Sequence, residues 1–388
     1  MNKKIAILGS TGSIGKSLLK IIKNKKNDFE IKLLSANKDY KNLFIQAKKF
    51  NVKNLIMTDK KSFIKLRNLN KNSNINIYND FNSLDKIFKK NKIDYVMSSI
   101  IGIQGLEPTM KIIKFTKTIA IANKESIVCG WNLINKELTK HHTKFIPVDS
   151  EHFSLWFGLK GLDSKKVEKF ILTASGGPLY KTPLNNFSEI KTSEALNHPN
   201  WKMGKKISID SATMINKIYE VIEAKNIFDI SYDKIDILIH PKSYVHALLK
   251  FTNGLIKIIA HDTTMEIPIF NTLFFNTNNK IFTKKLNVNS LNNLNFSKVD
   301  VKRYPMINLL KLLPKKTSLY ETVIVSANDA LVELFLKKKI KFTDINKKLF
   351  KFIKLKKFSK FKKIYPHNIS DIINLNNYVR LKIIKKSV

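Results

Sequence analysis

Near its N-terminus the chain reads Lys4-Ile5-Ala6-Ile7-Leu8-Gly9-Ser10-Thr11-Gly12-Ser13-Ile14-Gly15, and a helix-like stretch over residues 16–23 follows. An apolar strand, a glycine turn and a helix occur here in the order that a nucleotide-binding βα unit requires. The spacing is G-x-x-G-x-x-G rather than G-x-G-x-x-G, yet it permits a tight turn and a close approach of backbone to a pyrophosphate. The stretch predicts a dinucleotide site, with a purely structural turn as the alternative. The predicted cofactor residues are Gly9, Ser10, Thr11, Gly12, Ser13 and Ile14.

The end of the second expected strand, residues 30–34, indicates which dinucleotide would bind. An NAD-selective fold usually presents an acid there to the ribose 2′-hydroxyl, but this chain has no acid after the strand until Asp39. Asn37 and Lys38 instead offer hydrogen-bond donors and a positive charge, which suit a 2′-phosphate. These residues favour NADP over NAD. The alternative is that Lys38 is simply one of many lysines.

Apolar segments alternate with helix-like stretches over the first part of the chain, as in an α/β fold with a parallel, doubly wound sheet. The strands expected there cover residues 4–8, 31–34, 54–57, 95–98, 118–122 and 144–148. Further strands are expected at 169–173 and 243–251, and a helix at 321–337. We predict a Rossmann-like NADPH-binding domain over 1–149, a central α+β catalytic and connective domain over 150–275, an Asn-rich linker over 276–299, and a helical C-terminal domain over 300–388.

A second informative stretch, Pro147-Val148-Asp149-Ser150-Glu151-His152, sets two carboxylates one residue apart in an apolar segment. In an extended backbone residues i and i+2 face the same way, so Asp149 and Glu151 would converge while Ser150 turns aside. Two carboxylates and a third from elsewhere suit Mg²⁺ or Mn²⁺, which prefer oxygen ligands and keep positions open for water or substrate. A solvated strand end is the alternative.

Two turns in the middle of the chain carry further candidates. Ile121-Ala122-Asn123-Lys124-Glu125-Ser126 closes a strand and opens a helix. In open α/β folds ligands bind at that carboxyl edge of the sheet, so Lys124 could reach a substrate. Thr173-Ala174-Ser175-Gly176-Gly177-Pro178 offers a hydroxyl and a glycine pair. That turn could cup a phosphate or simply reverse the chain.

The densest cluster of polar residues runs from His198 to Glu220. A helix starting near Ser211 would put Asn216 and Glu220 on one face, so it could bind a phosphate near its start and a metal one turn later. The alternative is a surface helix with an ion pair between Lys217 and Glu220. His240 and His246, which follow, are read as structural residues.

Composition limits the class of protein. Lysine and arginine number 70 against 30 aspartates and glutamates, a formal net charge of +40. The lysines are spread through nearly every segment and no nucleic-acid-binding module is recognisable, so we expect no specific nucleic acid. The positive field should still favour anionic substrates. The single cysteine, Cys129, excludes an internal disulfide framework, and no apolar run approaches the roughly twenty residues of a membrane span. Because no signal peptide precedes the first strand, we expect a cytoplasmic protein without a membrane partner.

Six blocks appear in an order and spacing typical of one enzyme family: G-S-T-G-S-I-G, A-N-K-E-S, P-V-D-S-E-H, A-S-G-G-P, H-P-N-W-x-M-G-x-K-I-S-x-D-S-A-T-M-x-N-K and I-H-P-x-S-x-x-H. Over essentially its whole length the chain resembles the 1-deoxy-D-xylulose 5-phosphate reductoisomerase family. The resemblance implies a homodimeric, NADPH-dependent enzyme with Mg²⁺ or Mn²⁺. Its phosphorylated sugar substrate, 1-deoxy-D-xylulose 5-phosphate, would become 2-C-methyl-D-erythritol 4-phosphate in the non-mevalonate route to isoprenoids.

Carried over position by position, the resemblance assigns a role to each matching residue. The metal ligands would be Asp149, Glu151 and Glu220, with Glu223 as a further acid beside them. The catalytic residues would be Lys124, Ser150, Glu151 and His198, with Lys124 and Ser150 holding the reacting oxygens. The phosphate would be held by Ser175, Ser211, Asn216 and Lys217, near His198. Trp201 and Met203 would lie on a flap near 186–205, and the cofactor would also contact Asn123, Glu125 and Gly204.

Two departures from the family pattern stand out. Ile218-Tyr219 occupy positions where the family usually has Gly-Leu. Residues 260–269 read A-H-D-T-T-M-E-I-P-I where the family often reads G-x-P-D-M-R-x-P-I, so Glu266 replaces an expected arginine. Neither departure removes a proposed ligand.

Two other functions remain as alternatives. Another NADP-dependent oxidoreductase, such as a semialdehyde dehydrogenase, would need a nucleophilic cysteine and no metal, and Cys129 lies just after the A-N-K-E-S turn. A polyanion-binding protein without enzymatic activity would account for the net charge. Activity that depends on an added divalent metal would distinguish the metal enzyme from the dehydrogenase. NADPH oxidation would distinguish it from the polyanion-binding protein.

Overall fold

The structure is a computed structural model that describes residues 2–71, 73–89, 91–275 and 277–387. The chain forms two compact units that exchange segments. The first contains Met1–Ser126, Asn132–Asp149 and Met265–Ile281, and the second contains Ile127–Trp131, Ser150–Thr264 and Phe282–Val388. The division into three domains and a linker stays a prediction, and the first residue of that linker, 276, lies outside the described residues.

Within its described residues, the first unit holds a seven-stranded sheet in the order β4-β3-β2-β1-β5-β6-β7, and each pair of neighbours is parallel. The strands are β1 (Lys3–Leu8), β2 (Phe29–Ala36), β3 (Asn54–Met57), β4 (Asn76–Tyr78), β5 (Ile93–Ser98), β6 (Thr116–Ile121) and β7 (Lys144–Pro147). The predicted doubly wound parallel sheet is confirmed. The edge strand β4 was not predicted, because it is only three residues long and lies in an Asn-rich segment. The strand order reverses between β1 and β5, where such sheets bind ligands.

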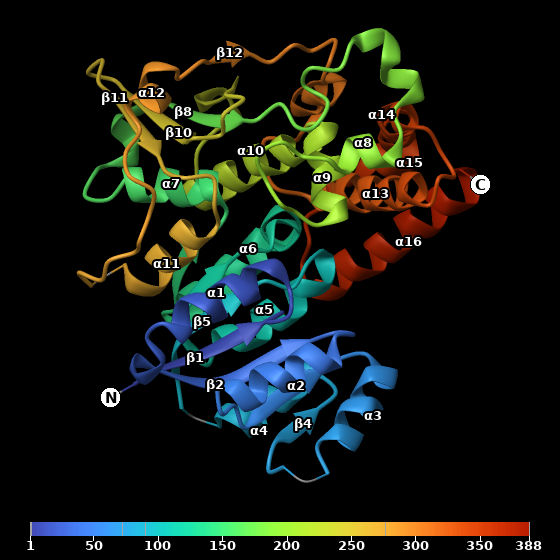
Figure 1. The fold of residues 1–388 in the computed structure, drawn as a ribbon. Coiled ribbons are helices and arrows are strands. Elements are labelled where there is room, and N and C mark those ends of the chain that lie inside the picture. Colours follow the sequence, from blue (N-terminus) through green and yellow to red (C-terminus); the bar gives the residue numbers. More distant parts are fainter. Residues whose placement is uncertain (1, 72, 90, 276, 388) are drawn as a thin grey trace. The chain divides into compact units, whose positions relative to one another are not determined.

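Helices cover this sheet because its central strands are apolar on both faces. Ile5, Ala6, Ile7 and Leu8 of β1 are all fully buried. Figure 1 shows α1 and α2, in blue, lying over the strands of this unit. The helices are α1 (Ser13–Lys23), α2 (Tyr40–Lys49), α3 (Lys60–Leu69), α4 (Leu84–Phe88), α5 (Leu106–Ile113) and α6 (Lys124–His141), whose middle residues belong to the second unit.

A segment far along the chain completes the first unit. Helix α11 (Glu266–Phe274) packs against α1, and Figure 1 shows the two helices side by side. The hydroxyls of Tyr95 and Thr272 lie 2.7 Å apart, and Lys3 Nζ donates to the carbonyl of Leu273 at 2.7 Å. Phe274 adds its ring to the same apolar core. The first unit is therefore assembled from residues more than 250 positions apart in sequence.

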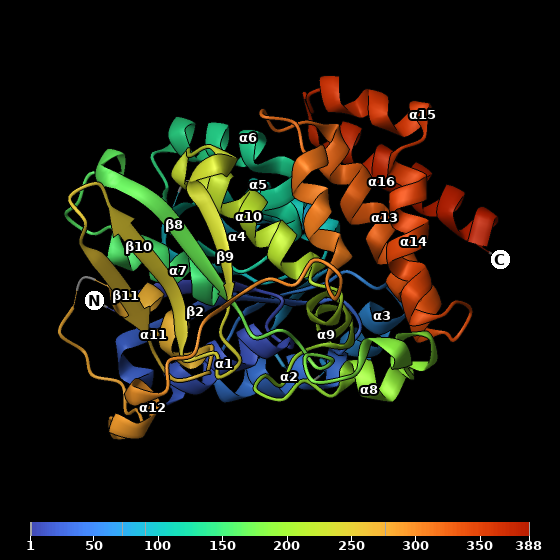
Figure 2. The ribbon, with the colours of Figure 1, turned by 90° about the horizontal axis from the view of Figure 1, so that it is seen from above.

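The second unit contains a mixed sheet in the order β11-β10-β8-β9-β12. Its strands are β8 (Val167–Ala174), β9 (Ile235–Ile239), β10 (Val245–Phe251), β11 (Ile256–Ala260) and β12 (Ser297–Lys298). Figure 2 shows β8, β9 and β10 side by side. Helices α7 (Ser150–Gly158) and α10 (Ile215–Phe228) pack on this sheet through a core that includes Leu155, Phe170 and Val221. The remaining short helices before the C-terminal region are α8 (Thr192–Leu196), α9 (Lys205–Ala212) and α12 (Val288–Asn292).

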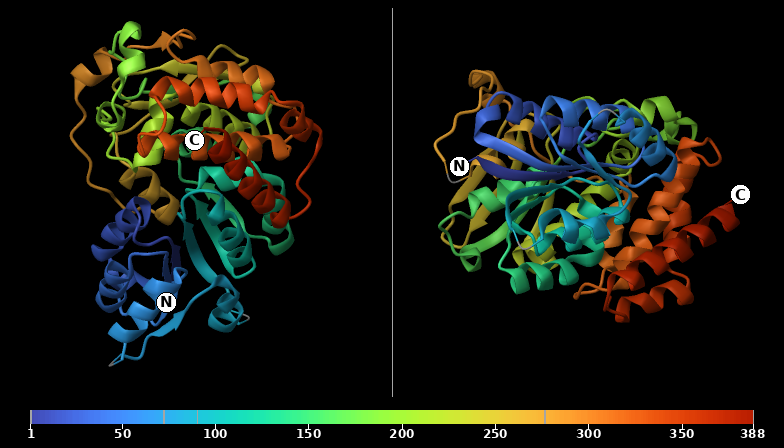
Figure 3. Two further views of the ribbon diagram at one scale, coloured as in Figure 1. Left: turned by 90° about the vertical axis from the view of Figure 1, so that its right-hand side faces the viewer. Right: turned by 90° about the horizontal axis from the view of Figure 1, so that it is seen from below.

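The C-terminal region is helical, as predicted. It contains α13 (Leu319–Leu336), α14 (Phe342–Ile353), α15 (Lys356–Ser359) and α16 (Ile369–Ser387), which gather around α13 in Figure 3. Helix α13 is buried along nearly its whole length, and it starts with a capping box made by Ser318 and Glu321. No helix among the described residues is long and apolar enough to cross a membrane.

Glu321 makes the stability of this region sensitive to pH. It is fully buried, and one carboxylate oxygen accepts hydrogen bonds from the Ser318 backbone N–H at 3.0 Å and the Ser318 hydroxyl at 2.8 Å. The other oxygen has no hydrogen-bond partner among the described residues. Burial raises the pKa of Glu321 to about 7, although the Ser318 hydrogen bonds oppose that rise. The folded chain therefore holds this proton more tightly than the unfolded chain.

We expect Glu321→Gln to stabilise the protein at pH 8 but much less at pH 5. The folded-state pKa lies above the unfolded value, so the wild type loses stability as pH rises toward and through 7. Glutamine keeps the capping box but carries no charge. The gain at pH 8 should be on the order of 1–3 kcal/mol, measured from urea unfolding at both pH values. An equal effect at both pH values would contradict this explanation.

Candidate active site

Helix α10 carries a buried polar face. It begins after Met214, whose φ of 68° lies in the left-handed region and separates α10 from α9. Lys217, Glu220 and Glu223 follow at spacings of three, so their side chains share one side of the helix. Their exposed fractions are only 4%, 1% and 1%. The prediction of a helix starting near Ser211 was wrong, because Ser211 lies in the last turn of α9.

Lys217 bridges two carboxylates. Its Nζ lies 2.7 Å from Glu151 Oε1 and also pairs with Glu220 Oε2. Burial alone would lower the pKa of Lys217, but the two carboxylates outweigh it and raise the pKa to about 12. The ammonium group therefore stays charged. The alternative of a surface helix with a weak ion pair is wrong, because the side chains of Lys217 and Glu220 are both buried. Buried charges of this kind must be paired.

Glu151 reaches this cluster from a helix rather than from an extended strand. Strand β7 ends at Pro147, and α7 begins at Ser150. The predicted extended geometry of Asp149, Ser150 and Glu151 was therefore wrong. Ser150 does not turn aside, because its hydroxyl donates to Glu151 Oε2 at 2.6 Å.

The three carboxylates predicted as metal ligands nevertheless converge. One oxygen each of Asp149, Glu151 and Glu220 lie within 4.8 Å of one another. Asp149 is the residue directly before α7, and its Oδ2 lies 2.9 Å from Lys124 Nζ. A donor set of three carboxylates is hard and anionic, which fits Mg²⁺ or Mn²⁺ better than a soft metal.

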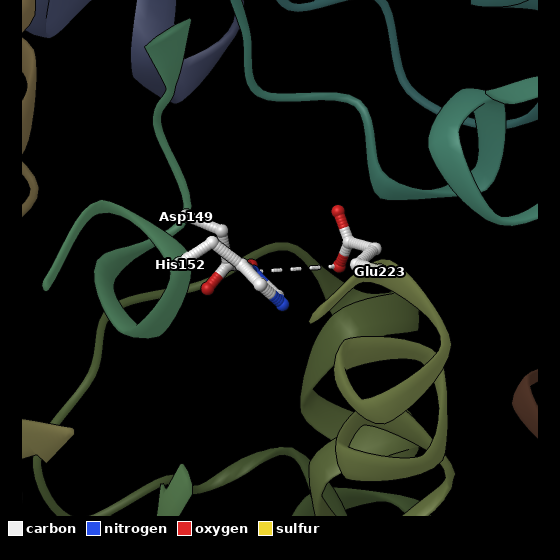
Figure 4. A group of neighbouring side chains, drawn as sticks. All are labelled: Asp149, His152 and Glu223. Carbon is white, nitrogen blue, oxygen red and sulfur yellow. Dashed lines mark ion pairs between the residues drawn. The ribbon is translucent and has the colours of Figure 1, made fainter. Parts of the chain in front are cut away.

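A histidine that was not among the predicted site residues, His152, lies beside this group. His152 is fully buried, and one of its ring nitrogens, Nε2, lies 2.8 Å from the Glu220 carbonyl oxygen. Its other ring nitrogen lies 3.8 Å from Glu223 Oε2, and Figure 4 shows this pair as a dashed line, with Asp149 next to His152. His152 thus ties α7 to the backbone of α10 at a metal-ligand position. A signal existed in the P-V-D-S-E-H block, where the histidine directly follows Glu151.

Ser175, one of the predicted phosphate residues, and His198 belong to a second polar group, whereas Asn216 and Lys217 lie with the carboxylates. Ser175 Oγ lies 3.0 Å from His198 Nε2 and accepts from the Gly177 N–H at 3.0 Å. Gly177 has a φ of +71°, and a Cβ there would come within 2.7 Å of the Ser211 carbonyl oxygen. Glycine is therefore required for the turn to approach the end of α9. The structure thus brings Ser175 and His198 together and places the following turn against the backbone of Ser211.

The protonation of His198 follows from its hydrogen bonds. Its Nδ1 accepts from the N–H groups of Asn200 at 3.2 Å and Trp201 at 3.1 Å. Because Nδ1 is an acceptor, Nε2 carries the proton and donates to Ser175 Oγ. Burial lowers the pKa of His198 to about 4, so the ring is neutral at pH 7. The Ser175 hydroxyl can then direct its own proton to an anion.

The segment around Trp201 is irregular and partly exposed. Residues 197–204 contain no helix or strand, and Gly204 precedes α9 as its N-cap. Trp201 and Met203 are both half-buried. The Trp201 ring meets the His246 ring edge-on, with centroids 6.1 Å apart. His246 is buried, and its ring stacks on that of His261 with centroids 3.7 Å apart.

The predicted cofactor turn has a tightly fixed backbone. Gly9 has a φ of +84°, and a Cβ there would meet the Ser99 carbonyl oxygen at 2.9 Å. Ser10 is fully buried, with its hydroxyl donating to Gln46 Oε1 at 2.7 Å. Thr11 and Gly12 then lead to α1, which starts at Ser13 with Ile14 second. The contact with Gln46 was not predicted, because Gln46 lies on another helix, α2.

Asn123, Lys124 and Glu125 lie at the start of α6, and all three are buried. Asn123 caps the helix by accepting from the Ser126 N–H at 2.6 Å, and it donates to the Gly102 carbonyl at 2.8 Å. It thereby joins the turns after β5 and β6. Asn37 and Lys38, at the end of β2, are exposed.

Three family models match successive parts of the chain. The model described as "1-deoxy-D-xylulose 5-phosphate reductoisomerase" matches residues 5–130. The model "1-deoxy-D-xylulose 5-phosphate reductoisomerase C-terminal domain" matches residues 145–228, and the model "DXP reductoisomerase C-terminal domain" matches residues 262–382. The chain is 57% identical over 387 residues to the 1-deoxy-D-xylulose 5-phosphate reductoisomerase of Pelagibacter ubique, with 100% of both chains covered. It is 38% identical over 381 residues to that of Clostridium novyi, with 97% of both covered.

Solved structures agree with these matches. The Zymomonas mobilis 1-deoxy-D-xylulose 5-phosphate reductoisomerase in complex with NADPH superimposes with a TM-score of 0.87 at 30% identity, covering 100% of this chain and 99% of that one. A DOX-P reductoisomerase in complex with NADPH, fosmidomycin and magnesium superimposes with a TM-score of 0.92 at 29% identity, covering 99% of this chain and 98% of that one.

Proposed function

The chain belongs to the 1-deoxy-D-xylulose 5-phosphate reductoisomerase family, and from that premise we propose that Asp149, Glu151 and Glu220 hold its metal. It is an NADPH- and divalent-metal-dependent enzyme that converts 1-deoxy-D-xylulose 5-phosphate to 2-C-methyl-D-erythritol 4-phosphate. The approach of the three carboxylates to within 4.8 Å carries the assignment. The metal is Mg²⁺ or Mn²⁺.

The remaining side chains bind and orient the substrate. When bound, the metal supplies a Lewis acid for the carbonyl and adjacent hydroxyl oxygens, and NADPH supplies the hydride. Lys124 and Ser150, each in contact with a metal ligand, hold the reacting oxygens. The phosphate is held by Ser175, Ser211, Asn216 and Lys217, with His198 behind Ser175. This binding, away from the reacting carbons, helps to position them.

Residues near 186–205 form a flap in this proposal. Trp201 and Met203 are its apolar contacts with the substrate, and Gly204 and the residues assigned to the cofactor complete the site. A closed flap would exclude water from the reactive aldehyde formed by the rearrangement. The irregular backbone of 197–204 and the partial exposure of Trp201 support this role.

The metal proposal predicts complete dependence on a divalent cation. With 1-deoxy-D-xylulose 5-phosphate present, EDTA should stop NADPH consumption, followed at 340 nm, and Mn²⁺ or Mg²⁺ in excess should restore it. The reason is that, without the metal, nothing in the proposed site supplies the Lewis acid that polarises the substrate carbonyl. Full activity in EDTA would contradict the assignment.

Asn37 and Lys38 should determine cofactor preference. We expect kcat/KM for NADPH to exceed that for NADH at least about tenfold, and Lys38→Glu to reduce that ratio by introducing a carboxylate opposite the 2′-phosphate. Asp59 lies within electrostatic range of Lys38 but caps α3, where it accepts from the Ser62 N–H at 2.9 Å. Lys41→Glu, on the neighbouring helix α2, serves as the control. If Lys38→Glu left the ratio of the two kcat/KM values unchanged, Lys38 would not recognise the 2′-phosphate.

Neither alternative function is favoured. A semialdehyde dehydrogenase needs a reactive cysteine, but Cys129 is fully buried within α6. It would also leave the three carboxylates without a role. The polyanion-binding alternative would not explain the family match.

The assembly and location are also part of the proposal. Strand β11 is an edge of the second sheet and exposes Ile256 and Ile258 by 57% and 49%, and Leu255, just before it, is 66% exposed. An exposed apolar edge strand is suited to pairing with a second copy, which supports a homodimer. A chain with one cysteine forms no internal disulfide and suits a reducing cytoplasm.

A further inference from the structure

Side chains proposed for the substrate are engaged by the proposed metal ligands. Lys217, proposed for the phosphate, places its ammonium group between Glu151 Oε1 at 2.7 Å and Glu220 Oε2. Asn216, proposed for the same phosphate, donates to the other Glu220 oxygen, Oε1. One cationic and one neutral phosphate-binding group are thus both turned toward a metal ligand.

The same pattern holds for the two residues proposed to hold the reacting oxygens. Lys124 Nζ lies 2.9 Å from Asp149 Oδ2, and the Ser150 hydroxyl donates to Glu151 Oε2 at 2.6 Å. All three proposed metal ligands therefore contact a side chain that is proposed to bind substrate.

Burial explains why Lys217 occupies this position. Its side chain is 4% exposed, and that of Glu220 is 2% exposed. Buried carboxylates that lack a cation are costly, so a charged group must accompany them. An ammonium ion bridging two carboxylates does this in the absence of metal. A divalent cation bound by Glu151 and Glu220 would carry twice the charge and compete for the same oxygens.

We infer that Lys217 is the internal counter-cation of Glu151 and Glu220, and that metal binding displaces it toward the substrate phosphate together with Asn216. The inference rests on the proposed function. Metal loading then prepares the phosphate site, and phosphate in turn draws Lys217 away from the carboxylates. The two ligands bind cooperatively, and the coupling must be equal in both directions.

The first test is a metal titration without substrate. Lys217→Met removes the competing charge, so it should bind Mn²⁺ about tenfold more tightly than the wild type in isothermal titration calorimetry, although it removes a residue of the active site. Lys206→Met is the matched control, because Lys206 also pairs with two carboxylates, Asp210 at 3.2 Å and Asp329 at 3.0 Å, neither of which is a proposed metal ligand. The control should leave Mn²⁺ affinity unchanged. Equal or weaker Mn²⁺ binding by Lys217→Met would overturn the inference.

The second test uses the wild-type chain and does not depend on the folding of a variant. Inorganic phosphate, at concentrations that keep Mn²⁺ in solution, should raise Mn²⁺ affinity, and Mn²⁺ should raise phosphate affinity by the same factor. Independence of the two ligands would overturn the inference. Failure of the proposed metal site is distinguished by Glu220→Gln, because that variant would then bind Mn²⁺ as the wild type does.

Discussion

Glu220→Gln should abolish most of the turnover and most of the metal response while the fold survives. Glutamine keeps the size and the hydrogen-bonding capacity of the side chain but removes one of three anionic ligands. Loss of a residue that only supports a ligand typically costs about 10–100-fold in affinity or activity, so loss of a ligand should cost more. The fold should persist because Lys217 keeps its pair with Glu151 at 2.7 Å.

Thermal unfolding with and without Mn²⁺ measures the metal response directly. The wild type should gain stability by mass action as Mn²⁺ is added, and Glu220→Gln should gain much less. Glu168→Gln is the control, because it makes the same change at an exposed ion pair with Lys250, 2.7 Å away. A Glu220→Gln variant with nearly full activity and the wild-type Mn²⁺ response would refute the metal assignment and the role given to its neighbours.

Gly15→Ala should have the largest effect on the cofactor half of the site. A Cβ at this position would lie 2.5 Å from Ser10 Cα and 2.6 Å from the Gly9 carbonyl oxygen. Both are backbone atoms of the turn, so α1 would have to move away from it. Overpacking of this kind costs about 1–3 kcal/mol or more. The variant should be less stable, and NADPH should no longer raise its melting temperature.

Gly12→Ala is the matched control within the same turn. The nearest atom to a Cβ there is the Gly9 carbonyl oxygen at 3.4 Å, and Gly12 has an ordinary extended backbone. Alanine should therefore cost less stability than Gly15→Ala in the absence of cofactor, about 1 kcal/mol or less, which is the preference of an N-cap position such as Gly12 for glycine over alanine. If both variants lost the same stability without NADPH, the close packing of α1 on the turn would not be the reason for Gly15.

The sequence predicted the parts of the fold that depend on local pattern. A strand was predicted over residues 54–57, which are the observed bounds of β3, and the glycine turn lies between β1 and α1 as expected. Short apolar runs bounded by turn residues are strong signals for buried parallel strands. The same pattern could not reveal that α11 belongs to the first unit, because that contact depends on residues such as Thr272 meeting Tyr95 across 177 positions.

At the site, the sequence predicted which carboxylates meet but gave the wrong reason for two of them. The approach of Asp149 and Glu151 was derived from an extended backbone, whereas Glu151 lies in the first turn of α7. The break at Met214 was also missed, since a left-handed residue that is not glycine or asparagine carries no clear sequence signal. Both features, the helical start of α7 and the left-handed Met214, depend on tertiary packing that a local sequence pattern does not show.

The position of α11 in the chain has a consequence for protein synthesis. The last strand of the first sheet, β7, is complete at Pro147, but the helix that packs on α1 begins only at Glu266. A ribosome adding about 5–20 residues per second would need on the order of ten seconds to bridge that interval. During this time the apolar side chains of α1 that share a core with α11 lack that partner. The nascent first unit should therefore be a target for chaperones, and a fragment ending near residue 149 should aggregate where the intact chain does not.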